Sequence, residues 1–197
     1  MNWDLRCAID AFIDLFDNNS DYVQTILSDK NNVANDMVDV INYDLANFAM
    51  YLSCSDGEIQ WSEAVVLEEQ CGISLTPEEI RNHVEEHSIF SREFETKVPL
   101  SIYMAVELDK YCRNQGKPLN KPICQIGVDI FSSLAEEVIA ADFDIDEAEL
   151  SDASNYIAML NKYIDENALE RKKTDSPKKV AVKVGIKKES IKAPKKQ

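Results

Sequence analysis

Apolar residues recur along the chain at intervals of three and four, the spacing that places side chains on one face of an α-helix. Up to Glu170, no comparable segment alternates with period two, so the sequence predicts no core strand. The periodic sets are Leu5, Ile9, Phe12 and Phe16; Val33, Met37, Ile41, Leu45, Phe48 and Leu52; Leu100, Met104, Leu108 and Tyr111; Ile123, Ile126, Ile130, Leu134 and Val138; and Leu150, Ala153, Ile157, Leu160 and Ile164. The pattern predicts an all-α fold.

Capping signals mark two helix starts. In Thr76-Pro77-Glu78-Glu79 the threonine suits the cap position, the proline suits the first turn, and Glu79 can close a capping box. Asp146 and Glu149 have the same spacing, so a second box is predicted there.

A helix break divides the chain. The segment 114–122, NQGKPLNKP, contains two prolines and a glycine and cannot continue a helix. We therefore expect a helical domain over 32–167, with halves at 32–113 and 123–167. Helices within 1–31 are expected to pack on this bundle.

The C-terminal segment 168–197 differs in composition from the rest. Residues 171–197 carry 11 basic and two acidic side chains, whereas 1–170 carry 10 basic and 34 acidic ones, so a charge of +9 is joined to one of −24. The segment has few large apolar groups to offset the entropy of ordering, and we expect a lysine-rich flexible tail. Its charge suits an acidic partner or nucleic acid, although Arg171 is its only arginine and it has no aromatic residue to stack on bases.

The compartment is inferred from what the sequence lacks. The five cysteines form no C-x-x-C pair, and the N-terminus has no basic segment followed by an apolar run. No apolar stretch of 18 residues occurs, so no membrane insertion is predicted. We expect a cytoplasmic protein with reduced, mostly buried thiols.

One motif occurs twice. At an offset of 86 residues, LANFAMYLSCSDGEIQWSEA aligns with FSSLAEEVIAADFDIDEAEL, and each copy reads as a helix, an acidic turn and a new helix. Ala49 meets Ala135, Leu52 meets Val138 and Ile59 meets Ile145. The acidic positions that coincide are Asp56 with Asp142, Glu58 with Asp144, and Glu63 with Glu149.

At these residues the chain resembles the TerB-like family of tellurite-resistance and stress proteins, whose pattern is an alanine-rich helix, an Asp-Gly-acid-Ile turn and a capped helix with glutamate. The resemblance covers about residues 32 to 166. It implies a compact bundle of about seven helices built from two related halves, with acidic turns that form a cation-binding surface. The second copy departs from the pattern, because Phe143 replaces the glycine.

The acidic turns have two interpretations. Carboxylates at a helix start stabilise the helix dipole and accept hydrogen bonds from free amides without binding a ligand. The crowding of acids in the second turn instead favours a hard cation such as calcium or magnesium, although the spacing excludes an EF-hand. The predicted metal ligands are Asp56, Glu58, Glu63, Asp142, Asp144, Asp146 and Glu149.

Catalytic motifs are nearly absent. HVEEH, with His83, Glu86 and His87, fits the H-x-x-E-H zinc pattern, but the motif is short and names no third ligand. No phosphate-binding glycine loop or G-x-S-x-G elbow occurs. The leading hypothesis is a non-enzymatic adaptor or sensor in a stress or defence response, with a protein partner. The alternatives are a zinc-dependent hydrolase and a nucleic-acid-associated factor acting through 171–197.

Overall fold

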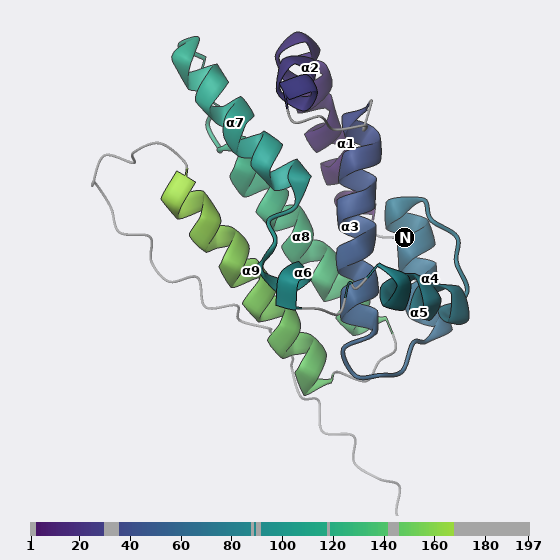
Figure 1. Ribbon diagram of the computed structural model, residues 1–197. Helices are drawn as coiled ribbons and strands as arrows, with labels where there is room; N and C mark the ends of the chain where they lie inside the picture. Colours follow the sequence, from purple (N-terminus) through teal and green to yellow (C-terminus); the bar gives the residue numbers. More distant parts are fainter. Residues whose placement is uncertain are drawn as a thin grey trace, which may run out of the picture.

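The computed structural model describes residues 3–29, 36–87, 89, 92–117, 119–141 and 146–167. These residues form nine α-helices and one short π-helix and contain no strand, which confirms the all-α prediction (Figure 1). The elements are α1 (Trp3–Asp17), α2 (Ser20–Asp29), α3 (Met37–Ser53), α4 (Trp61–Val66), the π-helix η1 (Leu67–Cys71), α5 (Pro77–Glu86), α6 (Arg92–Thr96), α7 (Leu100–Asn114), α8 (Ile123–Ala140) and α9 (Glu147–Asn167).

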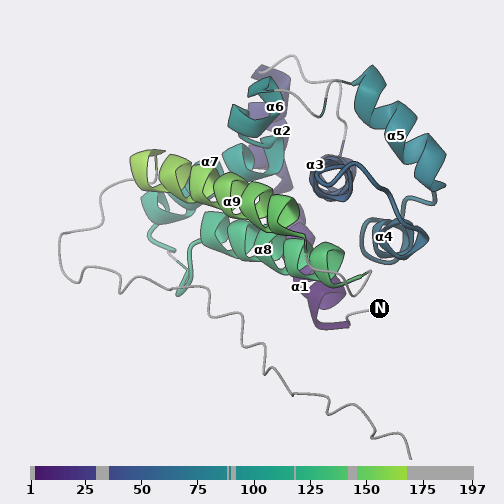
Figure 2. The ribbon, with the colours of Figure 1, turned by 90° about the horizontal axis from the view of Figure 1, so that it is seen from below.

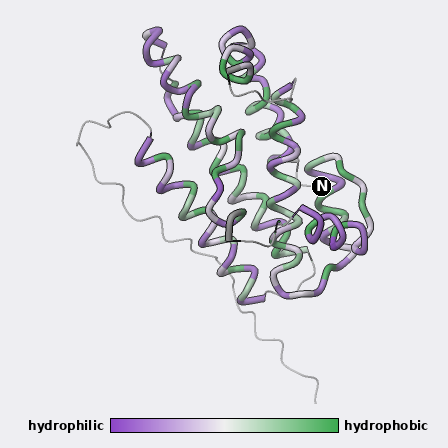
Figure 3. Tube along the Cα trace, viewed as in Figure 1, coloured by the Kyte–Doolittle hydropathy of each residue, from purple (hydrophilic) through white to green (hydrophobic). Residues whose placement is uncertain are grey.

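The core lies between α3 and α8, and α1, α7 and α9 pack around them (Figures 1 and 2). Phe48 in α3 lies 5.3 Å from Phe131 in α8, centroid to centroid, and 4.7 Å from Tyr156 in α9. Hydrophobic and hydrophilic positions are mixed along the long helices in Figure 3, as expected when one face of a helix is buried.

Gly127 allows three helices to approach one another closely. A Cβ at this position in α8 would lie 2.8 Å from Ile102 Cδ1 in α7 and 3.0 Å from Phe12 Cζ in α1. Such distances are shorter than side-chain contacts normally allow, so the glycine serves packing here rather than a turn.

A carboxylate from α7 supplies the missing cap of α8. Pro122 occupies the N-cap position of α8 and offers no side-chain hydrogen bond. Asp109 Oδ1 accepts from Ile123 N at 2.9 Å, and Asp109 Oδ2 accepts from Cys124 N at 3.0 Å. Two otherwise free amides are therefore satisfied from a neighbouring helix.

The helix pair α3 and α4 and the helix pair α8 and α9 begin at positions that keep the sequence offset of the repeated motif. Met37 and Ile123 start α3 and α8, Trp61 and Glu147 start α4 and α9, and each pair of starts keeps the offset of 86 positions. Buried residues follow the same offset: Leu45 and Phe131, Phe48 and Leu134, Ala49 and Ala135, Leu52 and Val138, and Glu63 and Glu149. The pairs differ afterwards, since α4 and η1 stop at Gly72, in the left-handed region with φ 70°, whereas α9 continues to Asn167.

The predicted capping box and helix break can be compared with the helix ends of the structure. The capping box of α5 is confirmed, because Thr76 Oγ1 accepts from Glu79 N and Glu79 Oε2 accepts from Thr76 N. α7 ends at Asn114 and α8 begins at Ile123, on either side of the proline-rich segment. The predicted flexible tail, 168–197, lies outside the described residues.

Two further expectations concern thiols and membranes. All five cysteines are free, but only Cys71 and Cys124 are buried, so the expectation of mostly buried thiols is wrong. Cys7, at an outward position of α1, is exposed. Among the described helices, none combines the length and the apolar character needed to cross a bilayer.

Candidate functional site

The first acidic turn, residues 54–60, connects α3 to α4. Asp56 Oδ1 accepts from Glu58 N at 2.8 Å, which closes a local turn through the aspartate side chain. Gly57 has φ 87°, a conformation that glycine adopts without steric cost. The Asp-Gly pair is thus explained by the turn geometry, while Glu58 stays exposed.

Glu63 is the buried carboxylate of this turn. It is the third residue of α4 and only 2% exposed, and its Oε2 accepts from the backbone N of Gln60 at 2.7 Å. The Gln60 backbone is extended, as a helix start requires. Glu63 therefore completes the N-terminus of α4 from inside the bundle.

The second acidic turn is described only from Asp146 onward, because Asp142 and Asp144 lie outside the described residues. Asp146 Oδ1 accepts from Ala148 N at 2.6 Å, so this aspartate caps α9. Glu149, the third residue of α9, is 2% exposed, as is its counterpart Glu63.

Three of the described carboxylates in these turns thus accept hydrogen bonds from backbone amides. No three His, Cys, Asp or Glu side chains in the described part of the chain are grouped so that they could hold a metal ion. Asp142 and Asp144 are outside that comparison, so a calcium or magnesium site over the seven named acids stays a prediction. The structure shows that Glu63 and Asp146 satisfy amides at helix starts and that Asp56 closes its turn.

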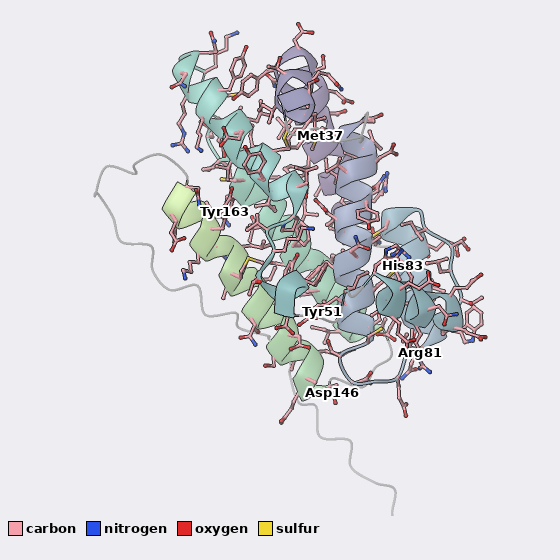
Figure 4. The ribbon with its side chains drawn as sticks, in the orientation of Figure 1. Met37, Tyr51, Arg81, His83, Asp146 and Tyr163 are labelled. Carbon is pink, nitrogen blue, oxygen red and sulfur yellow. The ribbon has the colours of Figure 1, made fainter. Side chains whose placement is uncertain are left out.

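A basic side chain lies beside the first turn. Arg81 in α5 lines a small cavity of about 220 Å³ together with Cys54, Gly57 and Glu85. Burial and the negative charge of Glu63 raise the pKa of the Cys54 thiol to about 11, and Arg81 opposes that shift. Arg81 therefore places a positive charge among the acids of this turn, and in Figure 4 it lies toward the same end of the molecule as Asp146.

The histidine pair lies at the end of α5. The rings of His83 and His87 are 4.3 Å apart, centroid to centroid, as expected one helical turn apart. Burial, and then the neighbouring His87, lower the pKa of His83. In the described residues no third ligand completes a zinc site around the pair.

Exposed apolar side chains gather on α4. Trp61 is 66% exposed and Val65, one turn further along, is 48% exposed. Glu58 precedes them and Glu68 follows them, and both are exposed. A solvent-exposed tryptophan flanked by acids is the type of surface that protein partners bind.

A large cavity was not anticipated from the sequence. It has a volume of about 1100 Å³ and is lined from α3, α7, α9 and the segments that follow η1, α5 and α6. Asp44, Asn47, Lys97 and Tyr156 are among its lining residues. The sequence did hold a signal, since Asp44 and Asn47 are polar residues within the apolar-periodic segment 37–52.

No protein-family model, no curated protein and no solved structure matches this chain. The resemblance to the TerB-like family therefore remains a prediction.

Proposed function

We propose that this protein is a non-enzymatic adaptor that binds a basic protein segment with apolar side chains on the surface formed by Asp56, Glu58, Trp61, Val65 and Glu68, called here the α4 surface. The observation that carries the proposal is the exposure of Trp61, 66%, next to that of Val65, 48%. Burying these two side chains supplies an apolar contact, and tryptophan is among the residues most enriched at interface hot spots.

The negative charge of the α4 surface favours a basic partner. Asp56, Glu58 and Glu68 are exposed along the same turn and helix, and residues 1–170 carry a net charge of −24. A second copy of this acidic face would be repelled, whereas lysine and arginine side chains would be attracted and steered toward it. Leucine or another apolar side chain between the basic residues would cover Trp61 and Val65.

The fold holds this surface in place. Glu63 points inward and bonds to the Gln60 backbone at 2.7 Å, while Ala64 and Leu67 are buried on the same side of α4 and η1. One face of this short segment is thus anchored in the bundle, so the opposite face presents Trp61 and Val65 on a supported backbone. A preformed surface of this kind costs little ordering entropy when it binds.

Trp61 fluorescence provides the test. The chain contains two tryptophans, so a Trp3→Phe background leaves Trp61 as the only indole. Titration with a synthetic peptide of alternating leucine and lysine should shift the Trp61 emission to shorter wavelength, and added salt should weaken binding. A leucine–glutamate peptide of the same length should leave the emission unchanged.

A matched pair of variants locates the binding. Val65→Ser should weaken binding of the leucine–lysine peptide. Leu119→Ser, at a side chain that lies between α7 and α8 and is 44% exposed, should leave this binding unchanged. Equal effects of the two variants, or equal binding of the glutamate peptide, would refute the α4 surface as the docking site.

The alternatives are separated by other measurements. Bound zinc in the purified protein would favour a hydrolase centred on His83 and His87. Salt-sensitive retention on nucleic acid that is lost when residues 171–197 are removed would favour the nucleic-acid-associated factor.

A further inference from the structure

The large cavity has a position and a size suited to a small molecule. α6 lies near α3 and α9 in Figures 1 and 2, and residues of all three helices line the cavity of about 1100 Å³. Ligand pockets commonly measure about 300 to 1,000 Å³ and are lined by aromatic groups with a few placed polar ones. This cavity is slightly larger than that range, and its lining combines aromatic side chains with a few polar ones.

Two asparagines of α3 hold buried hydrogen-bond acceptors at the cavity. Asn47 is 7% exposed and lines the cavity, and its Oδ1 has no hydrogen-bond partner among the residues that the structure describes. Asn42 also lines the cavity, and within the same described residues its buried Oδ1 has no partner either. An unsatisfied buried acceptor costs free energy, and a ligand that donates an N–H group removes that cost.

Asp44 adds a negative charge on the same face of α3. It lies three residues before Asn47, so the two side chains are neighbours on the helix surface. Asp44 Oδ2 accepts from Ser101 N at 2.7 Å, which caps α7 after Pro99 and fixes the carboxylate. This hydrogen bond uses Oδ2 alone and does not require the Oδ1 atom of the carboxylate.

Aromatic rings line the rest of the cavity. Phe94 and Tyr156 are stacked at 5.7 Å between centroids, and Tyr103 and Tyr163 line the cavity as well. Tyr163 is labelled on α9 in Figure 4. Asp44 and Tyr156 line the same cavity, and burial, followed by the negative charge of Asp44, raises the pKa of Tyr156. Aromatic faces next to a carboxylate favour an organic cation.

Charged side chains also line the outer part of the cavity. Among the described residues these are Asp39, His87 and Lys97, all exposed. Burial raises the pKa of the Asp44 carboxyl group, and the positive charge of Lys97 acts to lower it. The carboxylate of Asp44 and the Oδ1 atom of Asn47 are the acceptors in this cavity that favour a positively charged, hydrogen-bond-donating ligand.

We propose that this cavity binds a small organic cation, with an ammonium group held by Asp44 and Asn47 and an apolar or aromatic body against Phe94 and Tyr156. The ammonium donates to the carboxylate and to Asn47 Oδ1, and the rings cover the body of the ligand. This proposal does not depend on docking at the α4 surface, because the cavity is lined by none of the residues of that surface.

Calorimetric titration of the full-length protein at pH 7.5 tests the proposal with 2-phenylethylamine as the probe. 3-Phenylpropanoate has a similar shape and the opposite charge. The amine should bind saturably at one site and the acid should not. Equal binding of the two, or no saturable binding of the amine at millimolar concentration, would overturn the proposal.

Variants assign the binding to the inner groups. Asp44→Asn keeps an acceptor for Ser101 N but removes the charge, so affinity for the amine should fall at least about tenfold, the loss expected for a charge-assisted hydrogen bond. Asn47→Leu should lower the affinity for the amine as well. Asp39→Asn removes the same charge from the exposed rim of the same helix and should leave affinity within about twofold.

Thermal melting of each variant shows that it is folded. If Asp39→Asn weakens binding as much as Asp44→Asn does, attraction by surface charge explains the signal and the proposal fails. If folded Asp44→Asn and Asn47→Leu both bind the amine like the unmodified protein, the cavity is not its site.

Discussion

Asp109 in α7 holds the start of α8 through Cys124, whose backbone N donates to Asp109 Oδ2 at 3.0 Å. The aspartate is 5% exposed, and its other oxygen accepts from Ile123 N. Removing the carboxylate would leave two buried amides without partners, which is among the more costly single changes in a core.

Asp109→Ala should therefore lower the free energy of unfolding by about 2 to 3 kcal/mol. Urea denaturation measures the loss. Asp14→Ala, at an exposed position of α1, is the matched control and should change stability by less than about 0.5 kcal/mol. A loss at Asp109 no larger than that of the control would show that solvent replaces the cap.

Asp44 should make stability depend on pH. Burial raises its pKa from 3.8 to about 6, against the opposing hydrogen bond from Ser101. The folded protein therefore holds the proton more tightly than the unfolded chain does. The unfavourable contribution of the buried charge is present in full above pH 6, declines as the pH falls through 6, and is absent below 3.8.

The measurement compares the unmodified protein with Asp44→Asn. Relative to this variant, the unmodified protein should gain on the order of 2 kcal/mol in unfolding free energy as the pH falls from 7 to 4. The other carboxylates titrate in both proteins, so their contributions cancel in the comparison. A difference between the two that stays constant with pH, or decreases as the pH falls, would contradict the raised pKa.

The sequence predicted the helices well because their signals are local. The apolar spacing of Leu45, Phe48 and Leu52, for example, defines the buried face of α3 without reference to the other helices. The offset of 86 positions also located the starts of α4 and α9. Gly57 and the capping box at Thr76 follow from backbone chemistry within four residues.

The long-range contacts were not predictable in the same way. Asp44 lies 57 residues from Ser101, and Asp109 lies 14 from Ile123, so neither cap can be read from a sequence window. The cavity depends on side chains from several helices that meet only after folding. Sequence analysis detected acids at helix starts, but it could not separate carboxylates that cap a helix from those that face a ligand.

The cation-site prediction can be tested directly. If the acidic turns bind calcium or magnesium, millimolar amounts of either ion should raise the melting temperature by mass action, and zinc should do no better. Asp142→Asn combined with Asp144→Asn should abolish the increase. A flat melting temperature, with no metal in the purified protein, would leave Glu63 and Asp146 as helix caps, and Asp56 and Glu58 as part of the α4 surface.

The matching positions of two buried glutamates in α4 and α9 lead to a prediction. Glu63 and Glu149 are each the third residue of a helix, each 2% exposed, and 86 positions apart. Glu63 Oε2 accepts from Gln60 N at 2.7 Å, so alanine at this position loses a cap and leaves space in the core. Glu63→Ala and Glu149→Ala should each lower the unfolding free energy, by about 1 to 2 kcal/mol and by similar amounts.

Glu63→Gln, which keeps an acceptor and the shape of the side chain, should lower the unfolding free energy less than Glu63→Ala does. Glu68→Ala, at an exposed position just beyond α4, is the control and should change stability by less than about 0.5 kcal/mol. Urea denaturation of the four variants provides the comparison. A large loss at one glutamate and none at the other would show that the two positions share a register in the sequence but not a structural role.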